Sequence, residues 1–237
     1  MSMTTAACPH AGHDHTPSRA DAFRDFVAAD HFPCVGAKAA LSRGTMEIAE
    51  LGRLGSRSND AILLDGITRF ARYLERRPGD DLTLHTWVAV FDGPRDTDEK
   101  RFEALLWAQL QRLHDLDVSR GSRWSGEVSS DPDDPRFSLS LGGHPFFVIG
   151  LHPGASRQAR RFDWPAMVFN SHHQFDRLRA DGRYGRMQAA IRKRDGALQG
   201  SINPNLADFG DASEARQYSG REVEPNWRCP LRVRSKG

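Results

Sequence analysis

The chain contains few cysteines and no long apolar run. Its 237 residues include three cysteines, Cys8, Cys34 and Cys229, at scattered spacing. An odd number without regular spacing argues against a disulfide framework and predicts a reducing, cytoplasmic location. No apolar run approaches the ~20 residues that a membrane-spanning helix needs. The N-terminal stretch MSMTTAACPHAGHDHTPSR has neither the basic nor the apolar part of a secretory signal, so we expect neither export nor membrane association.

An excess of one charge is also missing. The 33 lysines and arginines nearly balance the 31 aspartates and glutamates, and the net charge is +2. The arginines are spread along the chain among acidic residues, whereas non-specific binding to nucleic acid favours a one-sided basic stripe. We therefore expect no nucleic-acid partner.

Common catalytic motifs are absent as well. The chain has no GxGxxG after a strand, no GxxxxGK[ST], no GxSxG, no HExxH and no CxxC. Each of these motifs carries a known mechanism, from phosphate binding to nucleophilic attack and zinc coordination. Their absence argues against a nucleotide-phosphate enzyme and against a familiar serine hydrolase.

What is present is a succession of helical and strand-like patterns. The predicted helices cover residues 18–30, 59–77, 96–117 and 174–198, a short one follows Cys34, and the predicted strands lie within 44–52, 82–94, 137–141, 145–151 and 166–175. The apolar strand over 145–151 is expected to be central. Helices combined with a hairpin-containing sheet predict an α+β fold with a mostly antiparallel sheet, packed helices and a long irregular C-terminal segment.

The N-terminal residues differ in composition from the rest. Residues 1–19 are small, polar and rich in histidine, which predicts a disordered tail, although Cys8 and its neighbouring histidines could also bind a metal ion. Residues 20–237 are predicted to form a single domain, because their length is ample for one hydrophobic core.

The stretch FPCVGAKAAL places Cys34 at the entrance of a predicted helix. Pro33 fixes the backbone before the cysteine, and Gly36 permits a tight turn behind it. Backbone N–H groups at a helix N-terminus stabilise a thiolate over a thiol, and such groups tune the iron at heme-thiolate sites. The same residues equally describe a small buried cysteine packed beside Phe32.

Histidine and arginine gather in GLHPGASRQARRF, residues 150–162. His152 stands at the end of a buried strand, where a ligand can approach. Arg157, Arg160 and Arg161 follow, and they could hold carboxylates or heme propionates through bidentate contacts. The alternative is a solvated basic loop whose histidine only caps the strand.

The stretch VFNSHHQF places Asn170, His172 and His173 at the junction of a strand and a helix. Histidines at such a position can serve as metal ligands, as proton donors or only as caps. The residue types alone leave these three roles open.

Taken in order, these stretches resemble the YqcI/YcgG family. The resemblance rests on FPCVGAKAAL, SSDPDDPRFSLSLGGHPFFVIGLHPGASRQARRF, VFNSHHQF, SEARQYSGR and WRCP, and it covers roughly residues 20 to 232. Some members of the family are heme-dependent N-hydroxylases of guanidino groups, as in the D-cycloserine and guanitoxin pathways, and others act on amines. The stretch GLHPGASR is similar to the guanitoxin-type branch.

The resemblance implies a heme-dependent monooxygenase that N-hydroxylates a guanidino or amino group of a small amino-acid-like substrate. It implies heme b, dioxygen and an external electron donor or reductase. Cys34 and His152 remain alternative axial ligands of the heme iron, with Cys34 preferred because thiolate donation favours O–O cleavage. Whether the protein forms a homodimer is left open by the sequence.

The resemblance also implies roles for the other candidates. Arg157, Arg160 and Arg161 become propionate anchors, and His172 becomes a distal proton donor or substrate contact beside Asn170. The C-terminal segment would hold the cationic head of the substrate through Asn203, Asp208 or Glu214. Two alternatives remain: a non-heme metal oxygenase built on His152, His172 and a carboxylate, and a heme-binding protein without catalysis.

Overall fold

The computed structural model describes residues 18–234. The tail expected over residues 1–19 therefore lies outside the described residues except at its end, as does the metal-binding alternative for Cys8. Ser18 is the first described residue, and its Oγ accepts a hydrogen bond from the Asp21 N–H at 3.0 Å and so caps the first helix.

A five-stranded sheet forms the centre, in the order β1-β2-β5-β4-β3. The strands are β1 (Met46–Leu51), β2 (Thr86–Phe91), β3 (Leu139–Leu141), β4 (His144–Leu151) and β5 (Ala166–Ser171). The α+β class is confirmed, but the sheet is mixed where a mostly antiparallel one was expected. β1 and β2 pair in parallel and the other pairings are antiparallel, because a helix connects β1 to β2 as a crossover.

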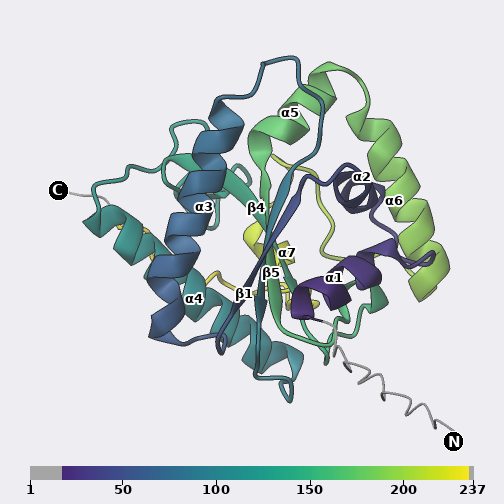
Figure 1. Ribbon diagram of the computed structural model, residues 1–237, viewed down its shortest axis with the longest axis horizontal. Helices are drawn as coiled ribbons and strands as arrows, with labels where there is room; N and C mark the ends of the chain where they lie inside the picture. The colour runs from purple at the N-terminus through teal and green to yellow at the C-terminus, as the bar shows by residue number, and fades with distance from the viewer. Residues whose placement is uncertain (1–17, 235–237) are drawn as a thin grey trace, which may run out of the picture.

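Helices cover both faces of the sheet, which Figure 1 shows nearly edge-on. One face packs against α3 (Asp60–Glu75) and α4 (Glu99–Ser119), and the other carries α1 (Arg19–Ala28), α2 (Val35–Ser42), α5 (His172–Ala180) and α6 (Tyr184–Gln199). Side chains alternate between the two cores along β2: Trp87 and Phe91 face α3 and α4, whereas Val88 and Val90 face α1.

Two local predictions concern glycines. The hairpin between β3 and β4 turns at Gly142 and Gly143, with φ of 62° and 76°, as the sequence predicts. The single helix predicted over 174–198 is wrong, because α5 ends before Gly182, whose φ is 73°, and α6 begins at Tyr184. A left-handed glycine is a frequent helix stop, and the break lets α6 fold back against α5.

The apolar strand predicted over 145–151 corresponds to β4. It has a neighbouring strand on each side, but the central strand of the sheet is β5.

After α6 the described chain forms one short helix, α7 (Ala215–Tyr218), and the residues around this helix are mostly buried. Buried Tyr218 ties it to the sheet, since its hydroxyl donates to the Phe146 carbonyl and accepts from the Leu139 N–H, each at 3.1 Å. Arg221 anchors the next turn through an ion pair with Glu103 of α4 at 2.8 Å.

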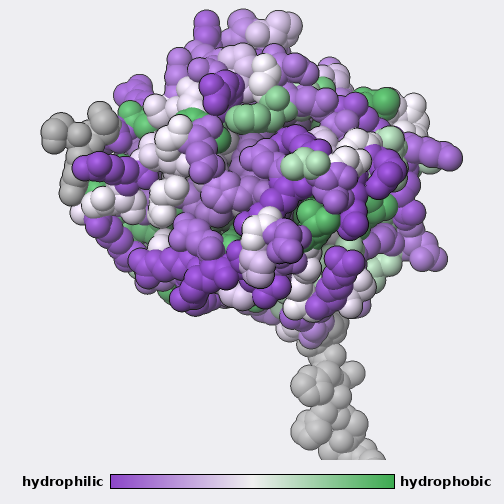
Figure 2. Space-filling model, turned by 90° about the horizontal axis from the view of Figure 1, so that it is seen from above, coloured by the Kyte–Doolittle hydropathy of each residue, from purple (hydrophilic) through white to green (hydrophobic). Residues whose placement is uncertain are grey.

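The face of the molecule seen from above is mostly polar, and Figure 2 shows hydrophobic residues scattered among hydrophilic ones on it. None of the helices within residues 18–234 is long and apolar enough to cross a membrane.

Candidate functional site

A cavity of about 300 Å³ lies between helices α2 and α6 and the sheet face that carries β4 and β5. Its walls are predominantly apolar, which is typical of sites for organic ligands and cofactors. The apolar side chains include Phe23, Phe32, Phe147, Ile149, Leu151, Val168, Phe175 and Met187. A few polar groups interrupt this wall, and they include most of the residues singled out from the sequence.

Cys34 lies on the cavity wall as the N-cap of α2. Its Sγ accepts a hydrogen bond from the Ala37 N–H at 3.4 Å, as the helix-entrance pattern predicts. Burial raises the pKa of the Cys34 thiol, while the N–H groups of Ala37 and Gly36 and the cation of Arg160 act in the opposite direction. Burial therefore favours the protonated thiol, and the sulfur lies among donors that would stabilise its thiolate.

Arg160 lines the same cavity. Its guanidinium donates to the carbonyls of Gly150 at 2.9 Å, Gln217 at 3.2 Å and Tyr218 at 3.4 Å. Burial lowers the pKa of Arg160 to about 10, so it stays cationic at neutral pH. Arg160 thus holds the end of β4 against α7 and places a positive charge close to Cys34.

Arg157 lines the cavity as well, in a buried ion pair with Asp195 of α6. It also donates to the Ser201 carbonyl at 2.8 Å and to the Ser201 hydroxyl at 3.1 Å. These contacts fix the end of α6 and the start of the C-terminal segment to the loop after β4.

Two further polar residues line the cavity. Asn170 lies at the end of β5, and Glu214 lies just before α7. Oε2 of Glu214 lies 2.9 Å from Nε2 of His172, and both residues are buried. His172 does not itself line the cavity. It packs against Phe209 with ring centroids 4.7 Å apart and orients the carboxylate that does.

A model of the YqcI/YcgG family matches residues 23–232. The chain belongs to the YqcI/YcgG family. The match covers nearly all of the described residues, including every residue that lines the cavity. Neither a curated protein nor a solved structure matches the chain.

His152 is separated from the cavity of this YqcI/YcgG member by the sheet. Its ring stacks on Phe102 of α4, with centroids 4.3 Å apart and planes inclined by 14°. Burial lowers its pKa to about 4, so the ring is neutral at neutral pH. The alternation of β4 explains the placement: Phe147, Ile149 and Leu151 line the cavity, and His152 follows the other face. The two candidate iron ligands therefore lie in different sites.

Two other candidates also lie outside the cavity wall. Arg161 donates to the carbonyls of Ala155 at 2.9 Å and Ser156 at 3.3 Å, within its own loop. Asp208 accepts from Gln188 and, at 3.1 Å, from Arg192, both of which line the cavity. Asp208 thus joins the C-terminal segment to α6 at the rim. Asn203 is the third candidate of that segment, and it does line the cavity.

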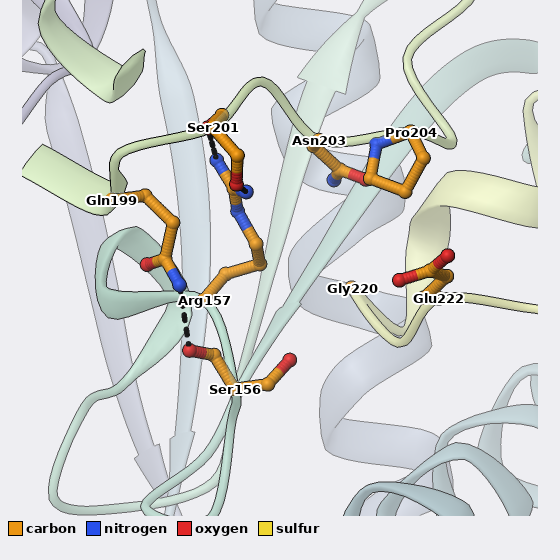
Figure 3. Close-up of a pocket in the computed structure, with 8 residues that line it drawn as sticks. All are labelled: Ser156, Arg157, Gln199, Ser201, Asn203, Pro204, Gly220 and Glu222. Carbon is orange, nitrogen blue, oxygen red and sulfur yellow. Dashed lines mark hydrogen bonds between the residues drawn. The ribbon is translucent and has the colours of Figure 1, made fainter. Parts of the chain in front are cut away.

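A smaller hollow of about 210 Å³ adjoins this site, because Arg157 and Asn203 line both spaces. Figure 3 shows the Arg157 guanidinium directed at Ser201 on one side, and Glu222 with Asn203 on the other. Most of its lining residues carry polar side chains, and Pro204 and Gly220 complete the lining. We regard it as the outer neighbour of the cavity and assign it no separate chemistry.

The structure adds residues that the sequence did not single out. Gln174 of α5 and the arginines Arg179 and Arg192 line the cavity. The sequence predicted only a helix over 174–198, and no local signal indicated that α6 folds over a cavity. Gln174 follows Asn170 by four residues across the junction of β5 and α5, and this short separation is the one sequence feature that links Gln174 to a candidate residue.

Proposed function

We propose that this chain binds heme b through Cys34 and N-hydroxylates a guanidino or amino group of a small amino-acid-like substrate. The reaction would use dioxygen and electrons from an external donor. The observation that carries the proposal is the convergence of Cys34, Arg160 and Glu214 on one apolar cavity.

The donor set suits a heme whose iron takes one protein ligand. The Cys34 sulfur faces the cavity with the Ala37 N–H bonded to it at 3.4 Å, and N–H groups of this kind tune a thiolate ligand. Iron binding requires the thiolate, and the Arg160 cation favours that form. Aromatic and aliphatic side chains supply the apolar walls that a porphyrin needs.

The substrate end of the cavity is assigned to Glu214 and Asn170. The contact with His172 engages Oε2 of Glu214, so Oε1 is available to accept an N–H from a guanidinium. The Asn170 amide can both accept and donate, and it would fix the orientation of the cation. A carboxylate held by a second side chain loses little rotamer freedom when it binds, which favours discrimination of cationic substrates.

When bound, heme supplies the activation of dioxygen that no side chain of the chain can provide. The protein's part is to hold the substrate nitrogen by Glu214, to exclude water by the apolar wall, and to accept the substrate proton at Glu214 Oε1. The overall reaction consumes one dioxygen, two electrons and two protons, and it releases the N-hydroxy product and water.

The alternatives receive less support. A non-heme metal oxygenase needs several clustered ligands, and within residues 18–234 no three His, Cys, Asp or Glu side chains gather as such a site requires. Its proposed ligands His152 and His172 do not line one space. A heme-binding protein without catalysis would have no need of the Glu214 and Asn170 pair.

The test is turnover by the reconstituted protein. Heme-loaded chain is mixed with a chemical or enzymatic reductant, oxygen and a panel of guanidino and amino compounds, including arginine. Oxygen consumption that depends on a substrate, together with an N-hydroxy product found by mass spectrometry, supports the proposal. Heme loading without oxygen consumption by any panel member favours the non-catalytic alternative, and failure to bind heme refutes the proposal.

A further inference from the structure

Two arginines of the cavity wall differ from the others in their surroundings. Arg179 of α5 and Arg192 of α6 line the cavity, and their side chains are 33% and 37% exposed. They come from α5 and α6, two helices that contact each other. Both are partly exposed cations in a predominantly apolar wall.

Each of the two arginines forms an ion pair that another carboxylate could replace. Arg179 pairs with Asp176 at 2.6 Å, and Arg192 pairs with Asp208 at 3.1 Å. The two aspartates are 59% and 49% exposed, and ion pairs of that exposure contribute little free energy. A carboxylate presented from inside the cavity could therefore replace either aspartate at small cost.

The inner arginines are committed to the fold. Arg157 is 10% exposed in its ion pair with Asp195, and breaking a buried pair is costly. The guanidinium of Arg160 donates hydrogen bonds to backbone carbonyls of β4 and α7 and so joins these two elements. Arg161 bonds within its own loop. Arg157 and Arg160 would have to break these contacts to bind a ligand, and Arg161 does not line the cavity.

We propose that Arg179 and Arg192, and not Arg157, Arg160 or Arg161, bind the two carboxylates of the heme. The inference rests on the proposed function, because it presupposes that the cavity takes this group. Both propionates leave one edge of the macrocycle, so the apolar edge would enter the cavity and the charged edge would lie toward solvent, where Arg179 and Arg192 are partly exposed. Arg179 also lies over the ring of Tyr184, another residue of the cavity wall, 4.4 Å from its centroid, which restricts the movement of its guanidinium.

The test compares hemin with hemin dimethyl ester, in which the carboxylates are blocked. The full chain is titrated with each compound in the wild type, in Arg179→Gln, in Arg192→Gln and in the double variant. Affinity is read from the Soret absorbance, and release from transfer to excess apomyoglobin. Arg186→Gln is the matched control, because Arg186 is an exposed arginine of α6 outside the cavity wall.

We expect each single variant to weaken hemin binding about fivefold and the double variant about 25-fold, since each partly exposed charged contact is worth about 1 kcal/mol. Binding of the dimethyl ester should change less than about twofold in every variant. Unchanged hemin affinity in the double variant, or an equal loss with the ester or in Arg186→Gln, overturns this inference alone. A wild type that binds no hemin overturns the proposed function together with it.

Discussion

Nε2 of His172 lies 2.9 Å from Oε2 of Glu214, and both side chains are buried. When the carboxylate is ionised, Nε2 must carry the proton and donate it. His172 is therefore a positioning residue for Glu214, which lines the cavity in its place. In the proposed function, the role expected for His172 therefore passes to Glu214, which the C-terminal segment supplies.

Replacement of Glu214 should impair substrate binding far more than heme binding. Glu214→Gln keeps the shape of the side chain and removes its charge, so the affinity for a guanidinium substrate should fall about tenfold to 100-fold. Hemin affinity should stay unchanged. The measurement is the substrate-induced change in the Soret band, with KM as the second reading.

Asp211→Asn is the control for that experiment. Asp211 is an exposed carboxylate of the same segment that does not line the cavity. Equal effects of the two substitutions would mean that Glu214 acts only through the net charge of the segment, and the substrate assignment would be wrong.

The ion pair between Arg157 and Asp195 should matter for stability. Asp195→Asn leaves the buried Arg157 cation without its counter-charge, so the free energy of unfolding should fall by about 3–5 kcal/mol. Asp176→Asn removes an exposed partner of Arg179 and should cost less than about 1 kcal/mol. Urea unfolding of both variants checks the difference, and similar losses would contradict the structural role given to Arg157.

Stability should also fall in mild acid because burial lowers the pKa of several histidines, most strongly those of His144 and His152. Burial lowers the pKa of His144 to about 3 and that of His152 to about 4, from 6.5. The unfolded chain takes up these protons below pH 6.5, whereas the folded chain does so only near the lowered values. The stabilisation is therefore complete above pH 6.5 and is lost as the pH falls toward 4.

Each histidine should contribute a slope of about 1.4 kcal/mol per pH unit within that window. Urea unfolding at neutral pH and near about pH 5 measures it. His144→Gln should make the dependence of stability on pH shallower, because only the contribution of His144 is removed. Replacement of the exposed His31 by glutamine should leave the dependence as in the wild type. A wild type whose stability is independent of pH across this range would contradict the burial of the two rings.

Gly150 on β4 should tolerate no side chain. A Cβ there would lie 2.7 Å from Leu106, 2.8 Å from Phe102 and 2.9 Å from the Tyr218 carbonyl. Gly150→Ala should therefore destabilise the domain by about 1–3 kcal/mol. Gly79→Ala is the matched change, since nothing lies within 4 Å of its added Cβ. Thermal unfolding compares them, and equal midpoints would show that α4 and α7 are not packed so closely on β4.

Local signals in the sequence predicted most of the fold. The capping serine at residue 18, the glycine pair of the β3–β4 hairpin and the cysteine at the entrance of α2 all act through neighbours in the chain. The parallel pairing of β1 with β2 depends on long-range packing instead. No residue of either strand specifies which side of the sheet its partner will join.

The candidate site was predictable in part for the same reason. Cys34, Asn170 and Glu214 do line one cavity, which only the folding of α6 over the sheet encloses. The side of the sheet on which His152 lies could have been predicted, because the alternation of side chains along β4 places it on the same face as Phe146 and Val148. The sequence interpretation used its place at the strand end and missed its side of the sheet.

The most direct test of the account is the optical spectrum of the reduced, heme-loaded protein with carbon monoxide. Thiolate ligation by Cys34 predicts a Soret maximum near ~450 nm. The maximum should persist in His152→Ala, whose ring lies outside the cavity, and it should be lost in Cys34→Ser. A spectrum of the imidazole type in the wild type that disappears in His152→Ala would contradict the central claim, as would a full-length chain that binds no heme.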